Sequence, residues 1–271
     1  MKKIILAISL SAISSFFLYN AQATEPNKRP ALETKPATTA DNASLYIHNL
    51  YQQIDFGKGE QLEEKVFQTA MTGYLNLKAA GKLNEQKDIL TVADFSKSST
   101  QNRLWVIDIR NKKVLFNTYV AHGQGSGMEY ATRFSNIDGT HASSLGFFVT
   151  GNTYTGQHGN SLRLNGMDKG FNDAALSRAI VVHAADYVSK GNVAAQGRLG
   201  RSWGCPALAP ELAQPIINKI KNGTCLFIYY PEKSYMKTAV WLNKKPVISD
   251  DNFAPRQLAE NTATTTEGNQ L

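Results

Sequence analysis

The sequence predicts an α+β protein, a mostly β domain preceded by a short helical segment. Three observations support this prediction: apolar residues recur at helical spacing before residue 81, short apolar runs bounded by turn residues follow from residue 88, and both ends of the chain are polar. A helix buries one stripe of residues whereas a strand alternates or runs apolar, so the change of pattern indicates a change of structure.

The chain divides into five segments by composition. Residues 1–23 place Met1-Lys2-Lys3 before an apolar run and then Ala21-Gln22-Ala23, the order of a cleaved secretory signal. We therefore expect an exported protein with no transmembrane segment after cleavage. The other segments are a polar, proline-bearing linker at 24–42, a helical preface at 43–87, the main domain at 88–232, and a C-terminal extension at 233–271 whose end is expected to be disordered.

The elements of the two folded segments follow from the spacing of apolar residues. Leu45, Leu50 and Ile54 indicate one helix, and apolar residues across 62–75 indicate a second. A further helix is predicted at 206–221, with Gly223 as its stop. Strands are predicted at 89–95, 104–109, 114–121, 145–150, 161–165, 180–184 and 223–230.

The formal net charge of +7 is a modest excess for 271 residues. It suits an anionic envelope polymer but is also common on soluble proteins. The basic residues are scattered, and no basic stripe is interleaved with aromatic residues, so a nucleic-acid partner is not expected.

The most informative block joins a strand that ends at His183 to the sequence GRSWGCPA at 200–207. If a helix starts directly after Cys205, its free amides favour a thiolate there, and we expect a low thiol pKa. A thiol with the usual pKa of about 8.5 is only slightly ionised at neutral pH, so His183 is the candidate base. The amides of Gly204 and Cys205 are candidate donors to an oxyanion. The block predicts Cys205 as a nucleophile.

Structural interpretations of the same residues remain open. Cys205 and Cys225 can form a disulfide, which the chain-entropy model values at about 3 kcal/mol. Because Cys225 lies in an apolar strand, we instead predict two free thiols, of which only Cys205 reacts quickly. His122 and His158 each precede a glycine and either line a cleft or satisfy backbone groups.

Metal and cofactor chemistry find no support in the spacing. The histidines match no common zinc pattern, and the glycines at 123–127 lead into no helix, as a nucleotide loop would. We expect no metal and no cofactor.

The block and its surroundings resemble a known family, the murein L,D-transpeptidase catalytic domain, which is YkuD-like. The resemblance covers about residues 88–231. It depends on His183, on the SWGCP sequence at 202–206, and on HG at 122–123, FSN at 134–136, SLG at 144–146, Tyr154, Gly156, HG at 158–159 and GT at 223–224.

The resemblance implies a mostly β fold and a reaction on peptidoglycan stem peptides in the periplasm or cell envelope of a bacterium. Cys205 would attack the carbonyl of the L-centre of diaminopimelate and expel D-Ala, and an amine or water would resolve the thioester. The backbone carbonyl of Ala184 would orient His183. Candidate substrate-binding residues are Ser202, Trp203, Arg201, His122, Tyr154 and His158, and protein partners are unknown.

Two positions depart from the commoner family pattern. Trp203 replaces a histidine, and Ala207 stands where the family has an arginine. Arg201 and Arg198 are candidate replacements for that arginine, and Trp203 either stacks on substrate or fills the core. The departures leave a second interpretation, a non-catalytic peptidoglycan-binding or envelope scaffold on a degenerate transpeptidase fold.

Overall fold

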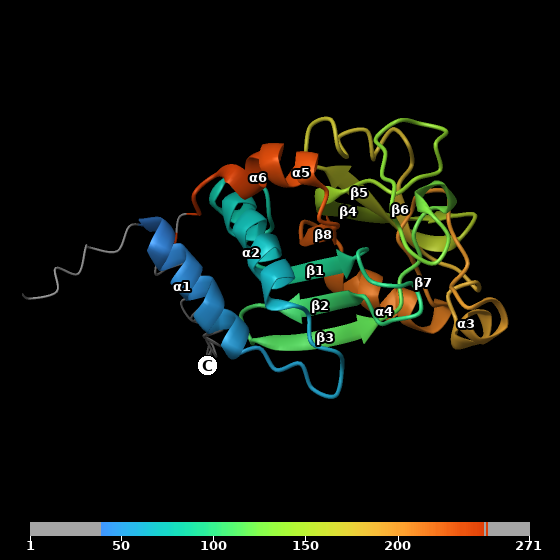
Figure 1. The fold of residues 1–271 in the computed structure, drawn as a ribbon, viewed down its shortest axis with the longest axis horizontal. Coiled ribbons are helices and arrows are strands. Elements are labelled where there is room, and N and C mark those ends of the chain that lie inside the picture. The colour runs from blue at the N-terminus through green and yellow to red at the C-terminus, as the bar shows by residue number, and fades with distance from the viewer. Residues whose placement is uncertain (1–38, 247, 249–271) are drawn as a thin grey trace, which may run out of the picture. The chain divides into compact units, whose positions relative to one another are not determined.

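The computed structural model describes residues 39–246 and 248 (Figure 1). The predicted signal at 1–23, most of the predicted linker at 24–42, and the end of the C-terminal extension lie outside these residues. None of the helices in the described residues is long and apolar enough to cross a membrane.

The described chain forms a curled mixed sheet with helices packed on it. The helices are α1 (Thr39–Gln52), α2 (Glu64–Ala79), α3 (Lys190–Gln196), α4 (Pro210–Ile220), α5 (Lys233–Thr238), α6 (Val240–Asn243) and the 3-10 helix η1 (Gln124–Ser126). The strands are β1 (Ile89–Asp94), β2 (Leu104–Asp108), β3 (Lys113–Thr118), β4 (Gly146–Gly156), β5 (Gly159–Gly166), β6 (Val181–Ala184), β7 (Ala207–Leu208) and β8 (Cys225–Tyr229). The predicted α+β fold class is confirmed.

The strands lie in the order β3-β2-β1-β8-β4-β5-β6-β7. Neighbouring strands are antiparallel except β1 with β8 and β6 with β7, which are parallel. The last strand in sequence, β8, therefore lies in the middle of the sheet, and its side chains are buried throughout. The far edge, β5 to β7, carries both parts of the informative block.

Each strand predicted from the sequence is present, with different ends. The predicted strand at 114–121 ends at Thr118, and β4 continues past its predicted end to Gly156. The predicted helix at 206–221 begins later than expected, at Pro210, because Ala207 and Leu208 pair with β6 as a strand. Proline favours the first helical position, and the residue before it favours an extended backbone.

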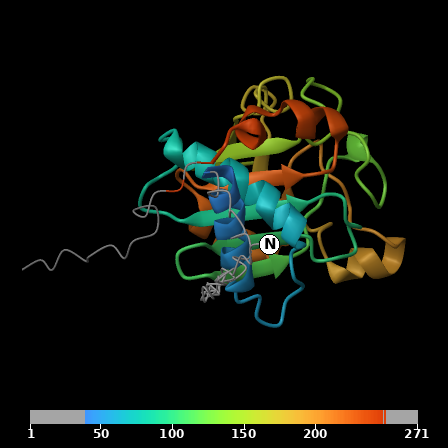
Figure 2. The same cartoon turned by 60° about the vertical axis from the view of Figure 1, so that its left-hand side comes forward.

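Helix α2 packs closely on the centre of the sheet, against β1 and β8, and α1 and α6 pack against α2 (Figures 1 and 2). Gly73 makes this close approach possible, since a Cβ atom there would lie 2.0 Å from Cζ of Phe147. Phe147 in turn stacks on Phe227 with ring centroids 4.1 Å apart. The helix and the sheet thus share one core.

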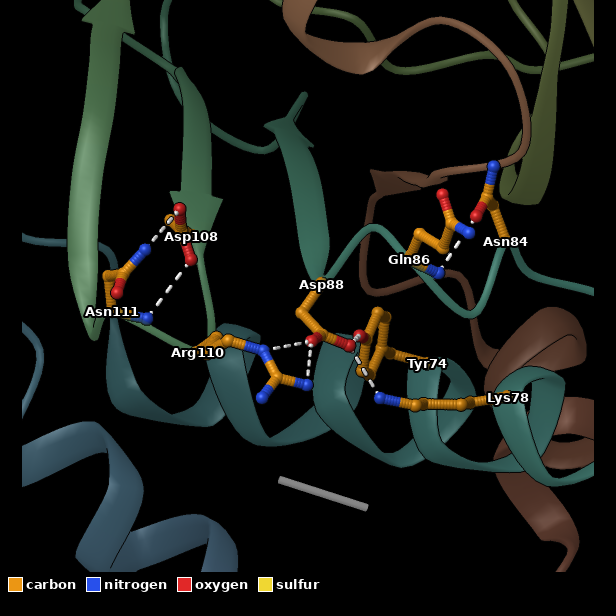
Figure 3. A network of polar contacts seen from close by, with 8 residues as sticks. All are labelled: Tyr74, Lys78, Asn84, Gln86, Asp88, Asp108, Arg110 and Asn111. Carbon is orange, nitrogen blue, oxygen red and sulfur yellow. Dashed lines mark hydrogen bonds and ion pairs between the residues drawn. The ribbon is translucent and has the colours of Figure 1, made fainter. Parts of the chain in front are cut away.

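A buried carboxylate ties α2 to the sheet (Figure 3). Asp88, just before β1, accepts hydrogen bonds from Lys78 at 2.5 Å, Arg110 Nε at 2.8 Å and Tyr74 at 3.2 Å. Burial alone would raise the pKa of Asp88, but the hydrogen bonds and charges of Lys78 and Arg110 hold it below its usual value. The carboxylate stays ionised and links two helical residues to the β2–β3 hairpin.

Candidate active site

His183 lies near the end of β6, held between β5 and β7. Its Nδ1 atom lies 2.8 Å from the carbonyl oxygen of Ala184. A carbonyl only accepts, so Nδ1 carries the proton and Nε2 keeps a free lone pair. Burial lowers the pKa of His183, the Ala184 hydrogen bond opposes this, and the charge of His158 lowers it further. The ring is therefore neutral at neutral pH and able to accept a proton.

The turn at residues 202–205 is fixed by serine hydroxyls. Ser202 Oγ donates to the carbonyl of Cys205 at 2.6 Å and accepts from the amide of Gly204 at 3.1 Å. Ser143 Oγ donates to the Gly204 carbonyl at 3.0 Å. Gly204 has φ of 120°, and a Cβ atom there would lie 2.9 Å from the Ala142 carbonyl oxygen. Only glycine fits this position.

The thiol of Cys205 is half-buried against backbone groups that precede His183. The amide of Val181 donates to Sγ at 3.4 Å, and Sγ donates to the carbonyl of Ala179 at 3.7 Å. Burial raises the pKa of Cys205, while the Val181 hydrogen bond and the charge of Arg178 act in the opposite direction.

The expected low thiol pKa is therefore wrong for this structure. It depended on a helix starting directly after Cys205, but α4 starts only at Pro210, after β7. Cys205 therefore does not occupy the N-terminus of a helix, the position for which the lowered thiol pKa was expected.

Cys205 and His183 open into one cleft with a volume of about 630 Å³. Its walls come from the β4–β5 hairpin, the segment before β6, β6 itself, and the turn before β7. The lining residues are Tyr154, Gly156, Gln157, His158, Arg178, Ala179, Val181, His183, Tyr187, Arg201, Ser202, Trp203 and Cys205.

Residues 58–229, more than half of the chain, match the family described as the L,D-transpeptidase catalytic domain. The chain belongs to this family. The predicted resemblance is confirmed, and the family is one of peptidoglycan-modifying enzymes of the cell envelope. The match begins within the predicted helical preface, so it includes α2.

Several solved structures are similar to this L,D-transpeptidase domain. An L,D-transpeptidase from Mycobacterium smegmatis is 16% identical with a TM-score of 0.32, over 53% of this chain and 59% of that one. The helical cell shape determining protein Pgp2 from Campylobacter jejuni is 14% identical with a TM-score of 0.36, over 60% and 57%. An L,D-transpeptidase from Stackebrandtia nassauensis is 14% identical with a TM-score of 0.33, over 70% and 91%.

The chain thus spans less than two thirds of the Mycobacterium smegmatis protein, of which it covers 59%. No curated protein sequence matches the chain.

Of the predicted oxyanion donors in this L,D-transpeptidase domain, one amide is occupied. The Gly204 amide donates to Ser202 Oγ. The amide of Cys205 has no acceptor within the described part of the chain. A developing oxyanion would find the Cys205 amide available, whereas the Gly204 amide would have to exchange its partner.

Most of the predicted substrate-binding residues line the cleft: Arg201, Ser202, Trp203, Tyr154 and His158. The His158 ring stacks on His183 with centroids 4.3 Å apart, so the β4–β5 hairpin touches the candidate base. Trp203 is 70% exposed, and its ring stacks on that of His141 with centroids 4.7 Å apart. It therefore does not fill the core, which leaves the interpretation that it contacts substrate.

His122 does not line the cleft, which corrects its assignment as a substrate-binding residue. It is fully buried, and its Nδ1 accepts from Arg103 at 2.8 Å. Nε2 then carries the proton and donates to the Gly127 carbonyl at 3.4 Å. Burial and the charge of Arg103 lower the pKa of His122 to about 3. Of the two roles expected for His122, it therefore has the structural one: its ring satisfies a backbone carbonyl in the loop beside the Ser202 turn.

Arg178 lines the cleft and was not predicted from the sequence. Its Nη1 donates to the Ser135 carbonyl at 2.7 Å and to Ser144 Oγ at 2.6 Å, and its Nη2 donates to the Ala142 carbonyl at 2.9 Å. Arg178 lies between predicted elements and in no motif, and only its closeness to His183 in sequence could have drawn attention to it.

The two arginines proposed as replacements differ in position. Arg201 lines the cleft and donates to the Gly127 carbonyl at 2.9 Å. Arg198 donates to the Leu199 carbonyl at 2.8 Å and is not among the lining residues of the cleft. Arg198 is thus not placed to bind a substrate in this cleft.

Both cysteines carry free thiols, Cys225 buried and Cys205 half-buried. Burial raises the pKa of Cys225 strongly, so its thiol is protonated and inert at neutral pH. Across the part of the chain that the structure describes, no three His, Cys, Asp or Glu side chains are grouped to hold a metal ion.

Proposed function

We propose that this domain is a peptidoglycan L,D-transpeptidase or L,D-carboxypeptidase with Cys205 as nucleophile and His183 as base. The main support for this proposal is that both side chains line the same cleft of about 630 Å³. In addition, Nδ1 of His183 donates a hydrogen bond to the carbonyl oxygen of Ala184. A nucleophile beside a base whose tautomer is fixed by a third group is the general pattern of covalent catalysis.

The first half of the reaction forms a thioester. Nε2 of His183 takes the Sγ proton, and the thiolate attacks the carbonyl carbon of the L-centre of diaminopimelate. The carbon–nitrogen bond to D-Ala then breaks, and the protonated His183 returns its proton to the leaving amine. The negative charge on the carbonyl oxygen during attack would be held by the Cys205 amide.

The second half releases the product. An amine of another stem peptide attacks the thioester to give a cross-link, or water attacks to give a free carboxylate. His183 takes the proton of the attacking group, and the Cys205 sulfur leaves as a thiolate. The two outcomes differ only in the acceptor.

The resting pair is neutral rather than ionic. Burial raises the pKa of Cys205 and lowers that of His183, so the proton stays on sulfur until the substrate is bound. No hydrogen bond joins the Cys205 sulfur to the His183 ring within the described residues. Proton transfer therefore requires rotation of the Cys205 side chain or a bridging water, and such contacts often tighten only with substrate in place.

Residues 1–23 support a second part of the proposal, export to the envelope, where peptidoglycan lies. N-terminal sequencing of the protein recovered from cells would show a start after Ala23 if the signal is cleaved as predicted. An intact N-terminus in the mature protein contradicts this part.

The experiment for the activity is incubation of the purified protein with muropeptides that carry tetrapeptide stems. Wild type and Cys205→Ala are compared with Cys225→Ala, which removes the other thiol. Wild type and Cys225→Ala should release D-Ala, and Cys205→Ala should not. Unchanged release by Cys205→Ala contradicts the mechanism, and binding without release by wild type supports the scaffold interpretation instead.

A further inference from the structure

Arg178 is a cation held in a fixed position at the wall of the cleft. Its three hydrogen bonds go to Ser135, Ala142 and Ser144, all in the loop before β4. A guanidinium anchored at both terminal nitrogens has little freedom left to turn. The side chain is therefore a preorganised charge rather than a mobile surface arginine.

The guanidinium has unused capacity. It carries five N–H groups, and the hydrogen bonds above use three of them. Nε is buried and has no hydrogen-bond partner within the described residues. The ion pairs of the described chain also include no carboxylate bound to Arg178. A buried donor without a partner, on a charge that no carboxylate binds directly, favours an anion beside it.

Arg178 is connected to the two segments that hold Cys205. Ala179, the next residue, accepts the Sγ hydrogen bond, and the Val181 amide donates to Sγ. On the other side, the Ala142 carbonyl that Arg178 binds is also the group that abuts Gly204. Arg178 thus continues through its backbone into one segment that holds Cys205 and binds the other segment through its guanidinium.

We propose that Arg178 is a positioning residue whose guanidinium stabilises the thiolate of Cys205 after His183 has taken the proton. It supplies the positive field that the sequence analysis assigned to a helix N-terminus. This inference rests on the proposed role of Cys205 as nucleophile. It also agrees with the direction in which the charge of Arg178 moves the Cys205 pKa, opposite to burial.

Other titratable groups face the same sulfur and must be kept constant in any test. His183 and His158 lie on one wall, and Tyr187 and Arg201 also line the cleft. Asp138 interacts with Arg178 through its charge. Variants at Arg178 leave all five in place.

The test is the pH dependence of Cys205 alkylation by iodoacetamide, read by mass spectrometry of the peptide that contains Cys205. Wild type is compared with Arg178→Gln, which removes the charge but keeps donors, and with Arg178→Lys, which keeps the charge. Arg198→Gln is the matched control, because it removes the same charge outside the cleft. Thermal melting of each variant reports the loss of the loop contacts separately.

A nearby opposite charge shifts a pKa by about 1–3 units, so Arg178→Gln should raise the thiol pKa by about one unit or more. At pH 7 this corresponds to roughly tenfold slower alkylation. Arg178→Lys and Arg198→Gln should stay within about half a unit of wild type.

An unchanged thiol pKa in Arg178→Gln, or an equal shift in Arg198→Gln, overturns the proposal. Should Arg178→Gln fail to fold, Arg178→Lys decides: a rise of a full unit despite the retained charge contradicts the inference. Because alkylation needs no peptide substrate, a negative result here with normal D-Ala release leaves the proposed function standing.

Discussion

Gly73→Ala tests whether α2 is part of the folded core of the catalytic domain. The added methyl group would lie 2.0 Å, 2.4 Å and 2.5 Å from three atoms of the Phe147 ring. An ordinary carbon–carbon contact is about 3.5–4.0 Å, so the ring or the helix must move by more than an ångström. Phe147 cannot move freely because it stacks on Phe227 at 4.1 Å.

The expected magnitude follows from two opposing effects. Alanine is a better helix former than glycine by about 1 kcal/mol, whereas overpacking a dense core costs about 1–3 kcal/mol and sometimes more. The overlap at Gly73 is severe, so overpacking dominates and we expect a net loss of about 1–2 kcal/mol in the free energy of unfolding. For a domain of this size each kcal/mol lowers Tm by roughly 2–4 °C.

The assay is urea unfolding of wild type and Gly73→Ala, with Gly191→Ala as the matched control. Gly191 is also helical, in α3, but a Cβ there would meet only Ser189 Oγ at 3.7 Å. Gly191→Ala should be as stable as wild type or slightly more stable. If Gly73→Ala matches Gly191→Ala in stability, the close packing of α2 on the sheet is refuted.

Three further predictions concern the site and one buried carboxyl group. Because burial raises the pKa of Cys205, its alkylation rate should keep rising with pH beyond 8.5 and not level off near neutrality. A rate that reaches its plateau by pH 7 in stopped-flow alkylation would contradict the raised pKa. Burial raises the pKa of Asp168 to about 6, above its unfolded value near 3.9, so the protonated carboxyl stabilises the fold at low pH and this contribution is lost between about pH 4 and 6. Asp168→Asn should therefore reduce the change in the free energy of unfolding between pH 4 and pH 7, measured by denaturation. An unaltered change would argue against a raised pKa. Trp203→Ala should raise KM for muropeptide more than it lowers kcat. Because Trp203 is 70% exposed, Tm should stay nearly unchanged, and a large fall in Tm would instead indicate a role in folding.

The sequence predicted the sheet because its strands carry strong local signals. Strands such as β1, β2 and β8 are apolar runs between turn residues, and their side chains are buried almost throughout, as that pattern predicts. The start of α4 could not be predicted, because Ala207 and Leu208 become a strand only through pairing with β6. That pairing joins residues far apart in the chain and leaves no local trace.

The site was predictable where a motif carried it and unpredictable where packing decides. Cys205 and His183 follow from the block at 180–207, and the Ala184 carbonyl follows from the family resemblance. Cys205 and His183 line one cleft, and the Ala184 carbonyl lies 2.8 Å from Nδ1 of His183. His122 lies in a matching motif too, but it is buried in the core, where it is hydrogen-bonded to Arg103, the residue before β2. Arg178 reaches the cleft through a loop whose position depends on the tertiary fold.

Trapping of an acyl-enzyme would show directly whether Cys205 is the nucleophile. Wild-type protein is mixed with a tetrapeptide muropeptide, quenched in acid, and examined by intact-mass and peptide mass spectrometry. We expect an adduct equal to the muropeptide minus D-Ala, located on Cys205 and absent from Cys205→Ala. D-Ala released at full rate by Cys205→Ala, or an adduct on any residue other than Cys205, would rule out Cys205 as the nucleophile.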